Sequence, residues 1–327
     1  MRDIGLTGVA FSGKSTLFTA LTRSGGVGGR ANQAVVHVPD PRLAVLTEME
    51  HSKKTVAAQV RFVDVPGGVT SAQGIAALRE ADALAIVLRA FGPDQNPAQE
   101  LANVEADLLL ADLAVIEPAA ERATKRALRD KSVAAEAAAL EKAHSILAGE
   151  NPLRGAELSP AGVALLKGVA PLTLKPLLIV ANLEEGTEIP DGLPGDTVGV
   201  YASIEAETAE MPEDEARALL EEFGVAEPGL DKVIHAGYRA LDLITFLTTG
   251  EDETRAWEVR KGAKAPEAAG VIHSDLERGF IRAEIIGYDD LVGAGSMDAA
   301  KHKGLTRVEG KDYVVQEGDI LNVRFAV

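Results

Sequence analysis

Short apolar runs alternate with amphipathic stretches over the first 250 residues of the chain. The apolar or alternating runs predict strands at residues 4–7, 35–38, 59–63, 83–89, 177–180 and 198–203. The run at 83–89 is apolar almost throughout, which indicates a central parallel strand buried on both faces. Leu17, Phe18, Ala20 and Leu21 recur at helical spacing after the first strand. This alternation predicts an α/β domain.

Residues 97–147 have a different composition, rich in Ala, Leu, Glu and Lys with helical periodicity. We expect two long antiparallel helices that turn near residues 129–132 and form an arm, over residues 97–169, inserted into the α/β domain. Pro118 falls inside the first of these helices and should kink or restart it.

The last third of the chain changes pattern twice. An acidic helical stretch is expected at residues 205–222 and a further helix at 231–247. Strands are then predicted at 255–259, 280–286, 313–315 and 320–325, with a helix at 266–273, as in a ubiquitin-like β-grasp unit. The predicted domains are therefore residues 1–96 with 170–250, the helical arm at 97–169, and a C-terminal unit at 251–327.

Composition narrows the class of protein. The 327 residues are 46% hydrophobic and 25% charged, and no apolar run approaches the roughly 20 residues that span a bilayer. The absence of cysteine excludes disulfides, thiol catalysis and cysteine zinc sites, and the six histidines show no metal-ligand spacing. We expect a cytoplasmic protein without a membrane partner, and a monomer rather than a stable oligomer.

The formal net charge of −17 argues against binding nucleic acid non-specifically over the whole surface. From Thr254 onward the chain has 11 Lys or Arg against 12 Asp or Glu, so the C-terminal unit is nearly neutral. The arm carries a basic cluster: Arg122, Lys125, Arg126, Arg129 and Lys131. Such a cluster suits contact with RNA phosphates, but a solvated helix face is the simpler interpretation.

The clearest chemical signal is a phosphate-binding loop between the first strand and the first helix. Gly8 to Thr16 fits the pattern G-x-x-x-x-G-K-[ST]. In such a loop, backbone N–H groups and the helix N-terminus surround a phosphate. Lys14 would bridge the β- and γ-phosphates and Ser15 would place its hydroxyl on Mg²⁺. The predicted nucleotide-binding residues of the loop are Phe11, Ser12, Gly13, Lys14, Ser15 and Thr16.

A second motif, D-x-x-G, follows Lys14 by 50 residues at the end of the strand at 59–63. Asp64 would hold Mg²⁺ through water, and the Gly67 amide is placed to sense the γ-phosphate. Alone, D-x-x-G is usually an ordinary turn, but the phosphate-binding loop upstream favours the nucleotide motif. Lys14, Asp64 and Gly67 are thus the predicted catalytic residues, and Ser15 and Asp64 the metal ligands.

The strand at 177–180 runs into Asn182-Leu183-Glu184-Glu185, where GTPases carry N-K-x-D. Glu185 replaces the Asp that pairs with guanine, and Leu183 replaces the Lys. Because the longer carboxylate cannot sit in the same geometry, guanine selectivity should be weak or lost. Asn182, Leu183 and Glu185, with Ser203 from the next predicted strand, are the expected base-pocket residues.

Over nearly its whole length the sequence resembles the YchF family of Obg-like ATPases. The matches include the N-x-x-E at residues 182–185, and the most specific are the stretches at 273–283 and 309–313. The resemblance implies a Ras-like P-loop NTPase core with a coiled-coil insertion and a C-terminal TGS domain. It also implies a preference for ATP over GTP and association with the ribosome or RNA.

The chain departs from the family pattern around the γ-phosphate. Ala10-Phe11 stands where members usually have Pro-Asn, whose Asn is linked to potassium-assisted hydrolysis, and no Thr lies between Ser24 and Thr47 to serve the first switch. In one respect the chain follows the family, which has an apolar residue in place of the catalytic Gln after D-x-x-G: Gly68-Val69 likewise offers no Gln. These features predict a weak ATPase, with turnover below about 1 s⁻¹. The alternatives are a GTP-binding protein with relaxed base specificity and a nucleotide-gated RNA- or protein-binding module without effective hydrolysis.

Overall fold

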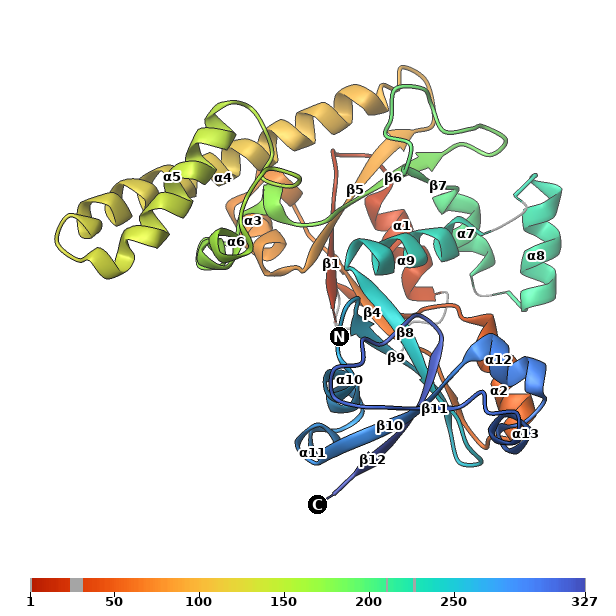
Figure 1. Ribbon diagram of the computed structural model, residues 1–327. Helices are drawn as coiled ribbons and strands as arrows, with labels where there is room; N and C mark the ends of the chain where they lie inside the picture. The colour runs from red at the N-terminus through yellow and green to blue at the C-terminus, as the bar shows by residue number, and fades with distance from the viewer. Residues whose placement is uncertain (1, 24–31, 210, 226–227, 327) are drawn as a thin grey trace. The chain divides into compact units, whose positions relative to one another are not determined.

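The computed structural model describes residues 2–23, 32–209, 211–225 and 228–326 (Figure 1). Its internal contacts divide the chain into two compact units. One unit combines Met1–Val36 with Arg61–Gly237, and the other combines His37–Val60 with Tyr238–Val327. The first switch region predicted between Ser24 and Gln33 lies mostly outside the described residues.

The first unit is built on a six-stranded sheet in the order β2-β4-β1-β5-β6-β7. Strand β1 pairs in parallel with β4 on one side and β5 on the other, so the strand order reverses there. Ligands of α/β sheets bind at this reversal, beyond the carboxyl ends of the strands. The strands are β1 (Asp3–Thr7), β2 (Gln33–His37), β4 (Gln59–Asp64), β5 (Ala83–Ala90), β6 (Leu177–Leu183) and β7 (Val198–Val200).

The core of this sheet follows from its sequence. In β5, Leu84, Ile86 and Leu88 are fully buried, as expected for a strand covered on both faces. The helices and 3₁₀ turns of the unit outside the arm are α1 (Lys14–Arg23), η1 (Gly68–Thr70), α3 (Ala72–Glu80), η3 (Leu172–Leu174), α7 (Ala202–Thr208), α8 (Glu213–Glu222) and α9 (Gly229–Ala240).

The predicted helical arm is present in the first unit. It comprises α4 (Pro97–Ala127), η2 (Lys131–Val133), α5 (Ala134–Ala148) and α6 (Pro160–Leu166). Asn96 caps α4 by accepting from the Gln99 N–H at 3.1 Å. Helices α4 and α5 run antiparallel, as Figure 1 shows. The end of α4 is hydrogen-bonded to the start of α5, for example from Arg126 to Glu136 at 2.9 Å. Helix α4 continues through Pro118, so the helix does not restart there.

The second unit contains a mixed six-stranded sheet in the order β11-β10-β12-β8-β9-β3. β8 and β9 form an antiparallel pair, and β12 pairs with β8 in parallel at Ile320 and Leu247. The apolar core of this unit includes Phe246, Ala269 and Ile285, from the sheet and helix α10. The elements are α2 (Pro41–Glu50), β3 (Thr55–Val56), β8 (Leu243–Thr248), β9 (Thr254–Arg260), α10 (Ala265–Ile272), α11 (Ser274–Arg278), β10 (Phe280–Gly287), α12 (Tyr288–Ala294), α13 (Met297–His302), β11 (Arg307–Glu309) and β12 (Asp319–Phe325).

Two predicted elements of the C-terminal region are wrong. The helix expected at residues 231–247 ends at Ala240, and Leu243–Thr248 is strand β8. Asp242, with φ of 54°, turns the chain between them, and a short apolar run does not by itself distinguish helix from strand. The strand expected at 313–315 makes only an isolated bridge between Val314 and Lys264.

Two further predictions are corrected within the first unit. The strand expected at 198–203 ends at Val200, and α7 begins at Ala202 because its N–H donates to Asn182 Oδ1 at 3.2 Å. The acidic stretch at 205–222 falls in two helices, α7 and α8. The domain boundaries proposed from the sequence remain predictions. In the part of the chain that the structure describes, no helix is both long and apolar enough to cross a bilayer.

Candidate functional site

The predicted nucleotide site assembles at the carboxyl ends of the strands of the first sheet. The loop from Gly8 follows β1, Asp64 ends β4, and Asn182 lies near the end of β6. Parallel pairing of β1 with β4 and β5, and of β5 with β6, brings these ends to one edge. Lys14 and Ser15 occupy the first turn of α1, where backbone N–H groups are free to bind an anion.

Gly13 is required at its position for two reasons. Its φ of 83° is in the left-handed region, and a Cβ there would lie 2.0 Å from Asn182 Nδ2. The Asn182 amide is almost fully buried and bridges two segments: Nδ2 donates to Ser12 O at 3.1 Å and Oδ1 accepts from the Ala202 N–H. Asn182 therefore holds the phosphate-binding loop against α7.

Phe91, which follows β5, also packs over this glycine. Its Cε1 would lie 3.7 Å from a Cβ on Gly13. The spacing of motifs did not single out Phe91, because a lone aromatic residue after a strand has no signature in sequence.

Lys14 and Asp64 contact each other in a half-buried ion pair. Lys14 Nζ lies 3.4 Å from Val65 O as well. The Lys14 ammonium group, predicted to neutralise phosphate, is thus in contact with the Asp64 carboxylate, predicted to hold Mg²⁺. An anionic phosphate competing for Lys14 would release the Asp64 carboxylate.

The segment after Asp64 forms a tight turn that leads into α3. Gly67 and Gly68 have φ of 73° and 45°, and both Thr70 N–H and Thr70 Oγ1 donate to Gly67 O. Ser71 then caps α3 by accepting from the Gly74 N–H at 3.0 Å. Position 68 carries no side chain beside the predicted γ-phosphate position.

The remaining loop residues differ in exposure. Phe11 is 90% exposed with φ of 65°, so its ring projects from the loop into solvent. Ser12 is buried and its Oγ has no hydrogen-bond partner in the described chain, whereas Ser15 is exposed and Thr16 is half-buried. The backbone of Ser12, rather than its hydroxyl, makes the contact with Asn182.

The predicted base-pocket residues are not all brought together. Leu183 is buried in a small apolar cluster with Ala90 and Ala181. Glu185 and Ser203 are exposed, and neither side chain forms a hydrogen bond within the described residues. Glu184, which the sequence did not single out, accepts from the Gly92 N–H at 3.3 Å through its carboxylate.

Glu205 is a buried acid that the sequence did not single out, because it opens the stretch predicted as an acidic helix. The residue is 2% exposed, and its carboxylate accepts from the N–H groups of Tyr201, at 3.1 Å, and Leu230, at 2.7 Å. Burial raises the pKa of Glu205 above its ordinary value, although these hydrogen bonds oppose the shift. The carboxylate joins the first turn of α9 to α7 next to the predicted base pocket.

The five basic side chains of the arm are exposed. Arg126 pairs with Glu136 at 2.9 Å, and Lys125 lies 3.7 Å from Glu121. These pairs suit a solvated helix face, the simpler of the two interpretations above.

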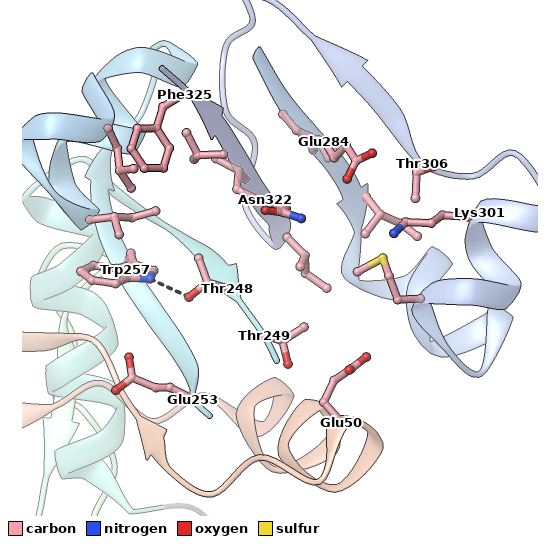
Figure 2. A pocket seen from close by; sticks show the side chains of 18 residues that line it. Glu50, Thr248, Thr249, Glu253, Trp257, Glu284, Lys301, Thr306, Asn322 and Phe325 are labelled. Carbon is pink, nitrogen blue, oxygen red and sulfur yellow. Dashed lines mark hydrogen bonds between the residues drawn. The ribbon is translucent and has the colours of Figure 1, made fainter. Parts of the chain in front are cut away.

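A separate cavity of about 500 Å³ lies in the second unit (Figure 2). Trp257 lines it and donates from Nε1 to Thr248 Oγ1 at 3.0 Å. Glu50, Glu253 and Lys301 add charged groups. None of the predicted nucleotide-site residues lines this cavity.

The predicted metal ligands, Ser15 and Asp64, offer oxygen atoms and suit Mg²⁺ rather than a transition metal. Within the described ranges, no group of three or more His, Cys, Asp or Glu side chains is placed to hold a metal ion. Mg²⁺ needs no such group, because it is bound by one or two protein oxygens together with substrate phosphates and water. The Ser15 hydroxyl and the Asp64 carboxylate are oxygen ligands of this kind.

Comparison with known proteins gives concordant matches. The family model YchF-GTPase_C, described as a protein of unknown function (DUF933), matches residues 243–326. The "Ribosome-binding ATPase YchF" of Bacillus subtilis (strain 168) is 39% identical over 362 aligned positions, which cover 99% of each chain. The protein of the same name from Escherichia coli O157:H7 is 38% identical over 358 positions, with the same coverage.

One solved structure matches the whole fold. The Schizosaccharomyces pombe YchF GTPase is 30% identical, with a TM-score of 0.89 over 99% of this chain and 97% of that one. The predicted P-loop core with a helical insertion is therefore confirmed. The TGS-like assignment of the C-terminal unit remains a prediction.

Proposed function

Because the chain belongs to the YchF family, we propose that it is a nucleotide-binding NTPase that prefers ATP, hydrolyses it slowly and works with the ribosome. The observation that carries the proposal is the loop from Gly8 to Ser15, which Asn182 holds beside Asp64 at the strand ends. The names of the bacterial relatives support the choice of ATP and of the ribosome as partner.

Each residue of the site has a role in this proposal. Lys14 exchanges Asp64 for the β- and γ-phosphates and stabilises charge on the transferred group. Ser15 and Asp64 would hold Mg²⁺, which supplies charge neutralisation of the phosphate oxygens when bound. The N–H groups of residues 12–15 orient the phosphates, and Asn182 keeps these groups in place.

We expect slow hydrolysis because position 68 has no side chain to orient the attacking water. A Gln side chain after D-x-x-G orients the attacking water in Ras-type enzymes, but Gly68 has no side chain. The first-switch segment at residues 24–31, which is not described, contains no Thr.

The preference for ATP rests on the N-x-x-E sequence. Glu185 is exposed two residues past the end of β6, next to Glu184, whose carboxylate accepts from the Gly92 N–H. Its position follows the strand that carries Asn182, where GTPases place the Asp that recognises guanine. A carboxylate longer by one methylene would not accept both guanine hydrogens in the same geometry.

A second candidate is a nucleotide-gated binding module without effective hydrolysis. It is favoured by Gly68 and by the mutual pairing of Lys14 with Asp64, which together leave the γ-phosphate side of the site without a reactive group. Binding of nucleotide would then set the state of the chain, and no turnover would follow.

Calorimetry with non-hydrolysable ATP and GTP analogues and Mg²⁺ tests nucleotide choice. We expect ATP to bind more tightly than GTP, Lys14→Ala to lose binding of both, and Glu185→Asp to narrow the difference. Tighter binding of GTP by the wild-type chain would refute the preference. Exposed Glu188→Asp, in the same loop, is the matched control.

Single-turnover hydrolysis separates the two candidates. We expect slow release of phosphate from ATP that disappears in Lys14→Ala. Binding without any release, with and without ribosomes, would favour the gated module instead. Cosedimentation with 70S ribosomes, with the ATP analogue compared with ADP, tests the partner; equal absence from the ribosome pellet in both states would contradict it.

A further inference from the structure

Thr7, the last residue of β1, carries a buried hydroxyl without a partner. Its side chain is fully buried, and its Oγ1 forms no hydrogen bond with any described residue. Leaving a buried hydroxyl unpaired costs about 1–3 kcal/mol. A valine of the same shape would avoid that penalty, so this conformation alone does not account for a threonine here.

The nearest part of the chain to this hydroxyl is the turn after the D-x-x-G motif. A Cβ built on Gly68 would lie 2.7 Å from Thr7 Oγ1 and 3.8 Å from Gly8 O. On its other side, a Cβ built on Gly74 would lie 2.1 Å from Gly68 O. The turn therefore passes between Thr7 and the first turn of α3, in contact with both.

This packing also explains why position 68 lacks a side chain. Any Cβ there would press on the Thr7 hydroxyl, and the φ of 45° adds strain for other residues. The polar group closest to the position of the usual catalytic side chain is thus the hydroxyl of Thr7.

Two hydrogen bonds within the turn help to hold this conformation. Gly68 N–H donates to Val65 O at 3.1 Å, and Thr70 N–H donates to Gly67 O at 2.9 Å. Its first residue, Asp64, is paired with Lys14. A phosphate that draws Lys14 away from Asp64 would remove this ion pair at the start of the turn. In the sheet, Asp64 pairs with Leu6, the residue before Thr7.

We propose that Thr7 is a positioning residue for hydrolysis. In the nucleotide-bound state its hydroxyl forms a hydrogen bond with the backbone of the Gly67–Gly68 turn and holds the Gly67 amide toward the γ-phosphate. This inference rests on the proposed function, since it assigns a residue to the same site.

The test compares Thr7→Val, which keeps the shape and removes the hydroxyl, with Thr7→Ser, which keeps the hydroxyl. Thr197→Val is the matched control, because Thr197 Oγ1 is also buried and unpaired but belongs to no part of the site. One lost hydrogen bond predicts hydrolysis about tenfold slower in Thr7→Val. Affinity for the ATP analogue should stay within about twofold, and Thr7→Ser should recover most of the rate.

A second readout does not depend on turnover. Hydrogen exchange of residues 65–74 should slow when the ATP analogue binds the wild-type chain and the Thr197→Val control, but not Thr7→Val. Equal slowing in Thr7→Val, or a wild-type hydrolysis rate in that variant, would overturn the inference and leave the proposed function intact. Failure of the wild-type chain to bind either nucleotide would refute the proposed function and this inference together.

Discussion

The junction between the helical arm and the core depends on one buried carboxylate, Asp112 of α4. It is fully buried, and its two oxygens accept four hydrogen bonds. Oδ1 accepts from Arg79 at 3.0 Å and from the Leu172 N–H at 2.9 Å, and Oδ2 accepts from the N–H and Oγ1 of Thr173, both at 2.8 Å. Arg79 lies in the last turn of α3, the helix that follows the D-x-x-G turn, so this carboxylate joins that helix, the arm and η3.

Substituting Asp112→Asn removes the charge and half of the acceptors without changing the shape. In either orientation of the Asn side chain, its NH₂ group takes the place of one carboxylate oxygen and faces the two donors that this oxygen accepts from. Arg79 also loses its carboxylate partner. Arg79 keeps hydrogen bonds to the carbonyls of Ala111 and Ala170, but its charge is then uncompensated. Breaking a buried pair of this kind costs about 3–5 kcal/mol, which is the loss we expect in the free energy of unfolding.

Urea denaturation followed by far-UV circular dichroism measures the loss, and hydrogen exchange at residues 170–176 locates it. Asp107→Asn, an exposed position on the same helix, should change stability by less than about 0.5 kcal/mol. A midpoint for Asp112→Asn equal to that of the control, with unchanged exchange at residues 170–176, would refute the assignment of the junction to this carboxylate.

Two further predictions concern the site. Gly13→Ala should lower ATP affinity at least about tenfold, because its Cβ would meet the Asn182 amide. Gly168→Ala, where a Cβ has open space, should leave ATP affinity unchanged. Equal ATP affinities of the two variants in calorimetry would contradict this prediction. Burial raises the pKa of Glu205, so the folded chain binds more protons than the unfolded chain between the ordinary and the raised pKa. Stability should therefore fall as pH rises through that interval and level off above it, and Glu205→Gln should remove this dependence in denaturation midpoints measured across pH.

The phosphate-binding motifs could be predicted from the sequence because they depend on interactions between residues close together in the chain. A glycine-rich loop between an apolar strand and an amphipathic helix forms from neighbouring residues, and the structure places Lys14 at the start of α1 as expected. Helix α2 also had local signals, with Asp40 as its N-cap and Pro41 in the first turn, but no helix was predicted there.

Elements whose character depends on distant partners were predicted less well. Leu243–Thr248 follows a helix and is mostly apolar, and only its place between β9 and β12 makes it a strand. Glu205 was predicted only as part of an acidic helical stretch, but it is buried, and the N–H groups of Tyr201 and Leu230 converge on its carboxylate.

By itself, the sequence determined the type of domain, the phosphate-binding loop, the D-x-x-G turn and the helical arm, since each depends on periodicity or on residues adjacent in the chain. Only the tertiary structure decided that Asn182 holds the loop, that Lys14 pairs with Asp64, and that Thr7 lies against Gly68. These contacts join residues 50 to 170 positions apart. Their geometry depends on how the strands of one sheet are ordered, and strand order is set by the packing of the whole domain.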